Sequence, residues 1–489
     1  MNIFILTLYT YALIFVSQRI VVADWFEYIL KDIGKFSFEK LYGEKTSRSL
    51  FEYIDFDVEP CDNFYKLSCN NWIKSREKLR GSNESFAYNS RTSNFEYFIK
   101  EFGKGKYNNE SRAIYTLYKL RERCNELSED KFEDCELIIK IFGTYALSAI
   151  FIKTNKIRSE ENGDYNIIED MIVRIKEELR LLINERKDIF DEETRNNFMY
   201  KLNRMEFKKN YDEHDLSNVE LMDDCYESIG INYSGKIEQI LKTIDDYFKT
   251  LLDNDEHILN TCEMKIFLPK KYTYLYVYRN GWYNITSNFF TVSSDSLNEP
   301  SFSRYFPNSL NYGYLGFTLG HEMFHAFDSR NFNRILEGDN INEFNVTQMS
   351  MENYKEKSDC FVKQYSMQKE SVTNLNINGL ETLSENIADN GGIKIVHRAY
   401  MKWLQSNGGK DLVVPGFENF TNEQLFFISL GRSYCEYQSK DKLENQIKRS
   451  NYAPGEIRTN VALSNYKPFS NAFKCKLNSK MNPKGKCEL

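Results

Sequence analysis

Apolar residues return at three- and four-residue spacing along much of the chain, which is the period of one face of a helix. The stretches with this spacing are 135–207, 237–252, 315–327, 383–404 and 422–434. The segment 272–292 differs, because it is rich in Tyr, Phe and Val and favours strand. We therefore predict a mainly helical α+β protein, with a small β-sheet before the helix at 315–327.

The N-terminus carries an apolar stretch, residues 3–16, of the length of a secretory signal peptide. Val21-Val22-Ala23 follows, and this suits cleavage after Ala23. A membrane anchor is the alternative, but it would need roughly 18 or more unbroken apolar residues, and Gln18 and Arg19 interrupt this stretch. We therefore expect a signal peptide at 1–23 and a secreted protein. An uncleaved segment would instead leave a membrane-anchored ectoenzyme.

The cysteines agree with a secreted protein, and the charge argues against a nucleic-acid partner. None of the ten cysteines forms a C-x-x-C pair, so disulfides in an oxidising compartment are their expected use. The net charge is −7 and Lys and Arg are spread along the chain, so no nucleic-acid partner is expected. Six Asn-x-Ser/Thr sequons are compatible with a glycoprotein, although chance also produces sequons in an Asn-rich chain. They are at Asn83, Asn109, Asn232, Asn284, Asn345 and Asn419.

The segment His321-Glu322-Met323-Phe324-His325 carries the strongest chemical signal. Positions i and i+4 share one face of a helix, so His321 and His325 can both reach one metal ion. Glu322 lies at the rim of that face, where it can take a proton from a water activated by zinc. Two histidines on an ordinary helix face are the alternative, but the chain has only five His and two are here.

A catalytic zinc needs a third protein ligand, and Glu385-Asn386-Ile387-Ala388-Asp389 supplies a candidate. Glu385 and Asp389 again stand i, i+4 on one helix face. Glu385 can bind the metal, while Asp389 can accept a hydrogen bond from a ligating imidazole and fix its tautomer. Taken alone, this motif also fits two solvated carboxylates on a helix.

The two motifs together resemble the neprilysin family of zinc endopeptidases, which implies a zincin-like catalytic lobe beneath a helical lobe. PCDNFYKLSCNNW at 60–72, NSLNYG at 308–313 and NAFKCKLNSKMNPKGKC at 471–487 also resemble segments of that family. The resemblance covers the chain from about residue 50 to its end. It implies one Zn²⁺ per chain and peptide substrates.

The resemblance assigns the site residues individually. It implies zinc ligation by His321, His325 and Glu385, with Glu322 as the general base. Asp389 would orient a ligand.

Four further residues are implied to contact substrate. Asn280-Gly281-Trp282-Tyr283 resembles the family's Asn-Ala-x-Tyr strand, which pairs with the substrate backbone. Gly281 replaces the usual Ala, and a simple turn role for Asn280 is the alternative. Arg458 matches the arginine that grips a substrate carbonyl, and Arg91 resembles the one that binds the substrate's C-terminal carboxylate. The residues implied to line the pocket after the cleaved bond are Phe95, Phe317 and Tyr434.

Tyr452 is the main departure from the family, which has a histidine there to stabilise the oxyanion. Losing an oxyanion donor costs about a hundred- to a thousandfold in rate. A tyrosine hydroxyl can also donate to an oxyanion, so Tyr452 is a candidate catalytic residue by substitution.

The resemblance also implies disulfide pairs and a domain plan. The implied pairs are Cys61–Cys475, Cys69–Cys435, Cys360–Cys487 and Cys124–Cys135. Cys225 and Cys262 are left over, and whether they pair with each other stays open. The family has a long helical stretch between the cysteines matching Cys124 and Cys135, where this chain has ten residues. The predicted regions are a signal peptide at 1–23, an N-terminal segment at 24–60, a reduced helical lid lobe at 61–262 and a catalytic domain at 263–489.

Two functions follow as alternatives. One is a secreted zinc endopeptidase that hydrolyses extracellular peptides. The other is a catalytically impaired secreted homologue that binds zinc or peptides, which Tyr452 and the reduced lid favour because closure that excludes water would be lost.

Overall fold

The computed structural model describes residues 45–79, 87–209, 216–252, 261–268, 273–334 and 346–489. The predicted signal peptide at 1–23 and the following residues to 44 lie outside the described residues, as do the sequons at Asn83 and Asn345. The fold is mainly helical with two small sheets, as the sequence predicts.

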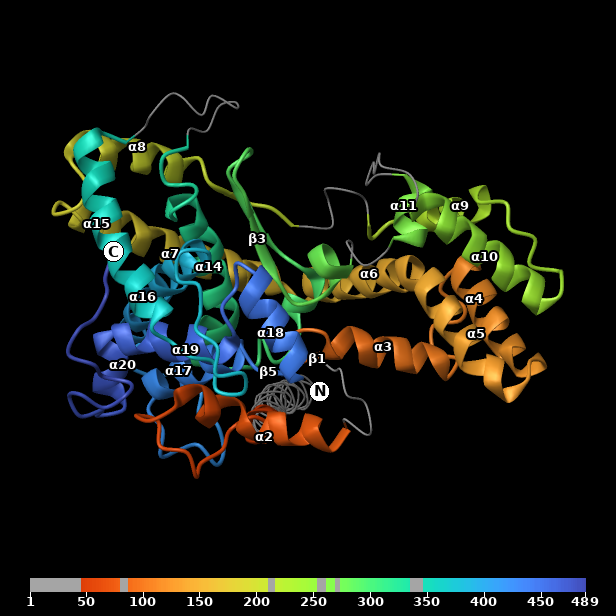
Figure 1. Ribbon diagram of the computed structural model, residues 1–489, viewed down its shortest axis with the longest axis horizontal. Coiled ribbons are helices and arrows are strands. Elements are labelled where there is room, and N and C mark those ends of the chain that lie inside the picture. The colour runs from red at the N-terminus through yellow and green to blue at the C-terminus, as the bar shows by residue number, and fades with distance from the viewer. Residues whose placement is uncertain (1–44, 80–86, 210–215, 253–260, 269–272, 335–345) are drawn as a thin grey trace, which may run out of the picture.

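The helices form two lobes (Figure 1), and the larger lobe contains most of the C-terminal half together with three earlier helices. Its helices are α2 (Phe64–Leu79), α7 (Asp164–Glu185), α8 (Glu192–Asn203), α13 (Asn308–Asn311), α14 (Phe317–Phe324), α15 (Gln348–Ser366), α16 (Leu383–Ser406), α17 (Asn422–Arg432), α18 (Lys440–Arg449), α19 (Gly455–Asn465) and α20 (Lys467–Ala472).

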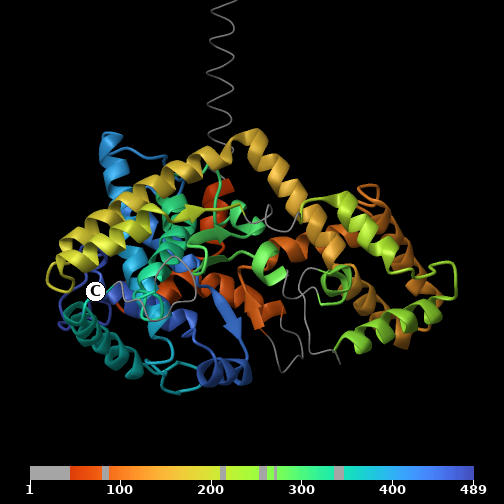
Figure 2. The ribbon, with the colours of Figure 1, turned by 90° about the horizontal axis from the view of Figure 1, so that it is seen from above.

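The smaller lobe is reached through α3 and α6, which extend from the larger lobe in Figure 1. Figure 2 shows the same division from above, with α7 continuing the path of α6 over the larger lobe. Buried apolar side chains form one continuous cluster through both lobes. The helices of the smaller lobe are α3 (Ser93–Gly103), α4 (Arg112–Arg123), α5 (Glu129–Phe142), α6 (Thr144–Asn162), α9 (Val219–Ser228), α10 (Ile237–Leu252) and α11 (Cys262–Phe267).

The predicted lid region 61–262 has contacts in both lobes. Helix α2 packs on α17 and α19, and α7 packs on α16. These helices therefore lie with the elements of 263–489, and the domain boundaries given above stay a prediction.

Two small sheets flank the centre of the molecule. Strand β1 (Ala87–Asn89) pairs antiparallel with β5 (Glu436–Gln438). In the second sheet β4 (Phe289–Val292) lies between β2 (Glu206–Phe207), which is parallel to it, and β3 (Gly281–Asn284), which is antiparallel. The strand predicted over 272–292 is correct only in part, because Thr273–Val277 forms a π-helical turn, η3.

The crossing of α14 and α16 positions the later chemistry, and three glycines make it close. A Cβ on Gly320 of α14 would meet the Val396 side chain of α16, and a Cβ on Gly391 of α16 would meet the ring of Phe324. A Cβ on Gly392 would lie 3.0 Å from the backbone nitrogen of His321. Glycine thus allows the two helix backbones to approach within direct contact.

All ten cysteines are paired, which confirms the four implied disulfides and shows that Cys225 pairs with Cys262. Two of the disulfides join the region around α2 to the C-terminal half. The pairs are Cys61–Cys475, Cys69–Cys435, Cys124–Cys135, Cys225–Cys262 and Cys360–Cys487.

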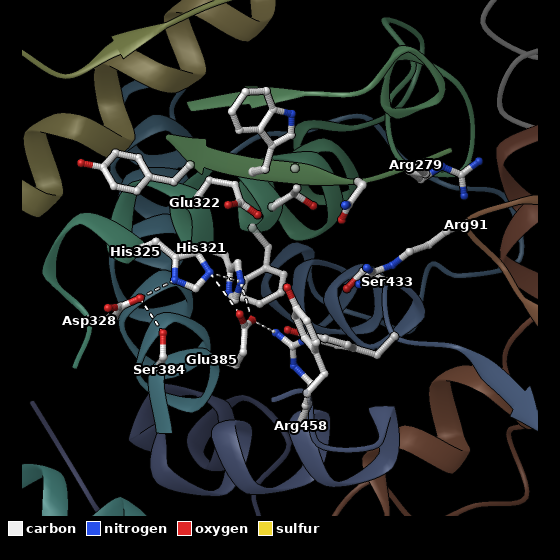
Figure 3. A pocket seen from close by; sticks show the side chains of 18 of the residues that line it. Arg91, Arg279, His321, Glu322, His325, Asp328, Ser384, Glu385, Ser433 and Arg458 are labelled. Atoms are coloured by element: carbon white, nitrogen blue, oxygen red, sulfur yellow. Dashed lines mark hydrogen bonds and ion pairs between the residues drawn. The ribbon is translucent and has the colours of Figure 1, made fainter. Parts of the chain in front are cut away.

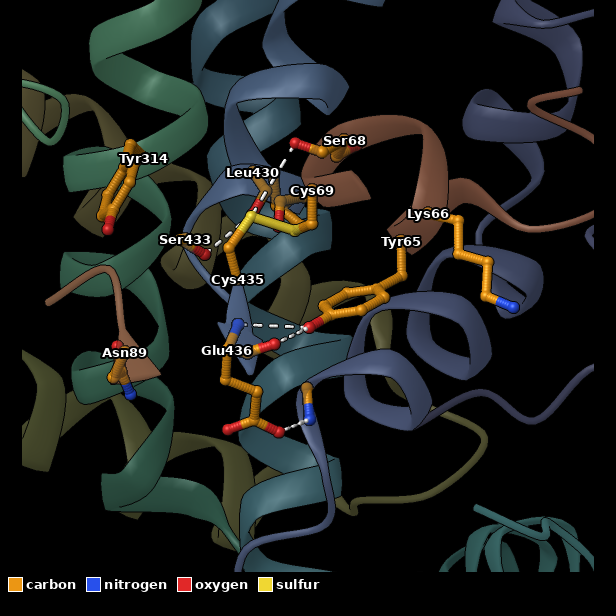
Figure 4. The surroundings of a disulfide bond; sticks show 12 residues. Tyr65, Lys66, Ser68, Cys69, Asn89, Tyr314, Leu430, Ser433, Cys435 and Glu436 are labelled. Carbon is orange, nitrogen blue, oxygen red and sulfur yellow. Dashed lines mark hydrogen bonds between the residues drawn. A yellow bond between two sulfur atoms is a disulfide. The ribbon is translucent and has the colours of Figure 1, made fainter. Parts of the chain in front are cut away.

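Figure 4 shows how Cys69–Cys435 fixes the strand β5 against α2. The Tyr65 hydroxyl donates to the Glu436 carbonyl at 2.9 Å and accepts from the Glu436 backbone N–H at 3.1 Å. The Glu436 carboxylate in turn accepts from the Gly455 N–H at 2.7 Å, at the start of α19. Helix α2 therefore holds β5 directly, and β5 in turn contacts the start of α19.

Within the described ranges no single helix is long and apolar enough to span a membrane, and only the bent pair of α5 and α6 passes that test when taken together.

Candidate metal centre

Three side chains converge where α14 and α16 cross. His321 is on α14, His325 begins the 3₁₀ turn η6 (His325–Phe327) that continues it, and Glu385 is on α16. The two Nε2 atoms lie 3.1 Å apart, and Glu385 oxygens lie 3.2 Å from His321 Nε2 and 3.6 Å from His325 Nε2. The sequence prediction that these residues meet is confirmed.

Each imidazole has its own carboxylate on the other ring nitrogen, and Figure 3 shows the one that faces His325. His321 Nδ1 lies 3.0 Å from an Asp389 oxygen, and His325 Nδ1 lies 2.6 Å from an Asp328 oxygen. Carboxylates at Nδ1 fix the tautomer that leaves Nε2 free to bind a metal. Both histidines therefore present Nε2 to the same point.

Asp328 is the functional residue that sequence reasoning missed. It is fully buried, and one of its oxygens accepts from the Arg330 and Asn331 N–H groups at 2.8 and 3.0 Å. The other accepts from the Ser384 hydroxyl at 2.7 Å as well as facing His325. Its position three residues after His325, where the η6 turn ends, is the signal that could have identified it.

Arg458 is fixed by the same network as His321. Its Nε and Nη2 donate to the two oxygens of Asp389 at 2.7 Å each, and Nη2 also lies 3.3 Å from Glu385. The Tyr434 hydroxyl donates to Asp389 at 2.5 Å. The Arg458 bonds use Nε and Nη2 of the guanidinium and do not involve Nη1. The sequence predicted only that Arg458 contacts substrate. In the structure it also binds Asp389, which orients His321, and contacts Glu385.

The pKa values show that the cavity favours positive charge. Burial lowers the pKa of His321, but Asp389 and Glu385 outweigh burial and bring it to about 10. Burial raises the pKa of Glu385, but His325 and His321 lower it to about 2 overall. Burial raises the pKa of Glu322. Carboxylates that would stabilise an imidazolium stabilise a bound metal cation in the same way.

Glu322 faces the three donors from across the cavity, next to strand β3. It is 6% exposed, so its carboxylate meets the cavity and little bulk water. A Cβ on Gly281 would lie 2.7 Å from Glu322 Cγ and 2.9 Å from Thr318 Cγ2. The glycine that replaces the family's alanine therefore leaves room for the Glu322 side chain in this arrangement.

The remaining predicted site residues line the same cavity, whose volume is about 250 Å³. Figure 3 shows Arg91 and Ser433 on one side and Arg458 below the metal-directed residues. Asn280, Gly281 and Tyr452 also line it. Of the residues expected to line the substrate pocket, Phe317 and Tyr434 do so, with ring centroids 5.7 Å apart. Phe95 instead packs in the core against Phe98 and Phe151.

The donor set fits zinc. Ligands about 2.0–2.2 Å from a tetrahedral ion lie about 3.3 Å from one another, and the observed separations are 3.1, 3.2 and 3.6 Å. Two imidazole nitrogens with one carboxylate, each oriented by a further hydrogen-bonding group, are the ligand pattern of a catalytic zinc site with one open position.

Comparison with known families agrees with this geometry. Residues 280–489 match the family described as peptidase family M13. These residues belong to peptidase family M13. His321, His325 and Glu385 form the intact zinc site of this M13 zinc metallopeptidase family.

The match to this chain covers a little under half of the length of each of two M13 relatives. The endothelin-converting enzyme homolog of Locusta migratoria is 30% identical over 345 residues, which are 71% of this chain and 45% of the relative. Neprilysin of Homo sapiens is 32% identical over 333 residues, which are 66% of this chain and 42% of the relative. The chain therefore spans less than half the length of these two relatives.

Solved structures show the same fold. A Mycobacterium tuberculosis zinc metalloprotease, Zmp1, in complex with an inhibitor has a TM-score of 0.51 at 19% identity, covering 74% of this chain and 52% of that one. A chain of the Haemonchus galactose containing glycoprotein complex has a TM-score of 0.58 at 16% identity, covering 91% of this chain and 98% of that one.

Proposed function

We propose that this chain is a secreted zinc endopeptidase that hydrolyses extracellular peptides. The observation that carries the proposal is the meeting of three metal donors and the buried Glu322 carboxylate in one cavity bordered by an open strand edge. The five disulfides support an oxidising compartment for the folded chain.

Zinc held by His321, His325 and Glu385 would supply Lewis acidity and lower the pKa of a coordinated water. Burial raises the pKa of the Glu322 carboxyl overall, whereas the two histidines bring that of Glu385 below its usual value, and a raised pKa suits a group that accepts a proton and later returns it to the leaving amine. Asp328 and Asp389 keep both imidazoles in the tautomer that this chemistry requires.

Strand β3 supplies the edge to which a peptide backbone can pair. Within the described residues β3 pairs only with β4, on one of its sides, and residues 279–283 line the cavity. Strand addition gives backbone hydrogen bonds without fixing a sequence. For a peptide paired in this way, Nη1 of Arg458 would donate to a carbonyl near the cleaved bond, and Arg91 would bind the carboxylate at the end of a short peptide. These roles stay proposals.

Tyr452 is proposed as the oxyanion donor in place of the family's histidine. It lines the cavity, is 39% exposed, and its ring lies 5.3 Å from Arg458 Cζ, a cation–π contact that orients it. Tyr452→Phe removes only the hydroxyl, so kcat should fall about a hundredfold with KM nearly unchanged. Steady-state kinetics of the variant measure this, and an unchanged kcat would show that Tyr452 does not stabilise the oxyanion.

Cleavage of a quenched fluorescent peptide library by the zinc-loaded mature protein tests the activity. Glu322→Gln should abolish cleavage while zinc binding, measured by metal analysis, stays stoichiometric. Glu192→Gln, at an exposed position of α8, is the matched control and should cleave like the wild type.

Cleavage that persists in Glu322→Gln would show a contaminating peptidase and overturn the proposal. No cleavage by wild type, with one zinc bound, would support the second candidate, a zinc-binding homologue with impaired catalysis. The observation that favours this candidate is the tyrosine at position 452.

A further inference from the structure

The sequon Asn284-Ile285-Thr286 lies at the border of the proposed substrate site. Asn284 is the last residue of β3, where it pairs with Phe289 of β4. Asn284 and Ile285 are half-buried, and Thr286 and Ser287 are exposed. The acceptor side chain therefore stands at the surface end of the strand that we propose to bind peptides.

The cavity runs along β3 and stops at this sequon. Residues 279–283 all line the cavity, and Asn284 is the next residue. Arg91 marks the other end, because its carbonyl accepts from the Arg279 N–H at 3.1 Å. A peptide paired to this edge would leave the cavity at two ends, past Arg91 and past Asn284.

Asn284 is chemically able to carry a glycan without losing its structural bond. Its Oδ1 accepts from the Ser287 N–H at 2.9 Å, and that bond uses the oxygen alone. In glycosylation the Nδ2 atom loses one proton and bonds to the anomeric carbon of a lipid-pyrophosphate oligosaccharide. The bond from that carbon to the pyrophosphate oxygen breaks, and the lipid pyrophosphate leaves.

The compartment permits N-glycosylation, and position distinguishes Asn284 from the other described sequons. Disulfide-bonded proteins fold where N-glycans are attached, and all ten cysteines here are paired. The other described sequons, at Asn109, Asn232 and Asn419, have exposed asparagines that do not line the cavity. Among the sequons that the structure describes, only Asn284 would place a glycan beside the strand edge.

We propose that Asn284 carries an N-linked glycan that limits how far a peptide can extend past that end of β3. The glycan is bulky and hydrated, so it excludes a longer chain without touching the cleaved bond. Short peptides, which end inside the cavity, are unaffected. This inference rests on the proposed peptidase function. It predicts that the enzyme prefers substrates with few residues on the side of the cleaved bond that points toward Asn284.

Glycopeptide mass spectrometry of the full chain secreted from a eukaryotic host tests the modification without any need for activity. Thr286→Ala keeps Asn284 and its bond to Ser287 but removes the sequon, so the Asn284 glycan should disappear. Thr286→Ser keeps the sequon, so the glycan should remain. An unmodified Asn284 in the wild type would overturn the proposal.

Two sets of quenched fluorescent peptides with one common cleavage sequence test the length limit. One set is extended by ten residues before that sequence and the other by ten residues after it. Thr286→Ala should raise kcat/KM about tenfold for one set only, and leave the unextended peptide unchanged. Thr286→Ser and Asn419→Gln, which removes an exposed sequon outside the cavity, should match the wild type.

An equal change for both sets, or for neither, would overturn the length limit. Should the wild type cleave no peptide, the same comparison is made by fluorescence polarisation of labelled peptides binding to the Glu322→Gln protein. Tighter binding of one extended set after Thr286→Ala would then support the glycan limit although the peptidase function had failed.

Discussion

At the scale of single residues, the metal centre depends on carboxylates that do not ligate. Asp389 and Asp328 each face the Nδ1 atom of one histidine. Both are fully buried, and each accepts further hydrogen bonds that hold it in place. Orientation of the ligands is thus built into α14, α16 and the turn after η6, before any metal binds.

Asp328→Asn should weaken zinc binding about 10- to 100-fold, the usual effect of removing a group that orients a ligand. Asp328 oxygens accept from four donors besides His325, and an amide has only one acceptor oxygen. Competition with a chromogenic chelator measures the affinity. Asp246→Asn, at an exposed position of α10, should bind zinc like the wild type, and equal affinities for both variants would contradict the assigned role.

At the scale of elements, the site exists because α14 and α16 nearly touch. Gly320, Gly391 and Gly392 remove the side chains that would separate the two helices. Helix α8 supports the same region from outside, because Lys201 Nζ donates to the carbonyls of Ala326 and Asn331 at 2.7 and 2.9 Å. These contacts fix the end of the helical segment that carries His325.

Gly391→Ala should lower the free energy of unfolding by about 1–3 kcal/mol, because its Cβ would overlap the ring of Phe324. Zinc affinity should fall with it, since the helices must separate. Denaturant titration measures the first quantity and chelator competition the second. Gly391→Ala combined with Phe324→Leu should recover part of both losses. Losses that simply add in the double variant would mean that the two side chains do not meet.

Lys201 predicts a pH dependence of stability. Burial lowers its pKa from 10.5 to about 7, so between these values the unfolded chain binds more protons than the folded chain. The free energy of unfolding therefore gains a term that rises with pH from about 7 to 10.5 and is constant below 7. Urea titrations of the metal-free protein from pH 7 to 10 measure it.

Lys201→Met should lose that rise, whatever its stability at pH 7. Lys442→Met, at an exposed position of α18, should keep it. Parallel pH profiles for wild type and Lys201→Met would show that Lys201 does not titrate in this range.

At the scale of the whole molecule, two disulfides join the start of the described chain to its end. Cys69–Cys435 holds α2 against β5, and β5 pairs with β1, which leads to Arg91. The two walls of the cavity thus depend on a segment far away in sequence. Cys124–Cys135 closes a short loop within the smaller lobe, with a sequence separation of 11.

Cys69→Ser combined with Cys435→Ser should lower the free energy of unfolding by about 2–5 kcal/mol. Cys61–Cys475 still joins the same two segments, but the loop that Cys69–Cys435 closes remains longer than the one closed by Cys124–Cys135. Cys124→Ser combined with Cys135→Ser should therefore cost less and leave peptide binding unchanged. Denaturant titration and peptide binding to each double variant measure this, and the reverse order of stabilities would refute it.

The amino-acid sequence by itself determined the residue types of the metal centre, the disulfide pairs implied by the family resemblance, and the mainly helical fold. His321 and His325 were predictable because i, i+4 spacing on one helix is a local property. Glu385 needed the resemblance, since no local rule places a residue 60 positions away beside them.

Only the tertiary structure decided which partners these residues meet. Asp328 faces His325, Arg458 binds Asp389, Phe95 packs in the core, and the sequon at Asn284 borders the cavity. The π-helical turn over Thr273–Val277 likewise replaces the strand that its aromatic and β-branched residues favour. The physical reason is the same in each case: local propensity and spacing act over a few residues, whereas burial and close helix packing join segments that are distant in the chain.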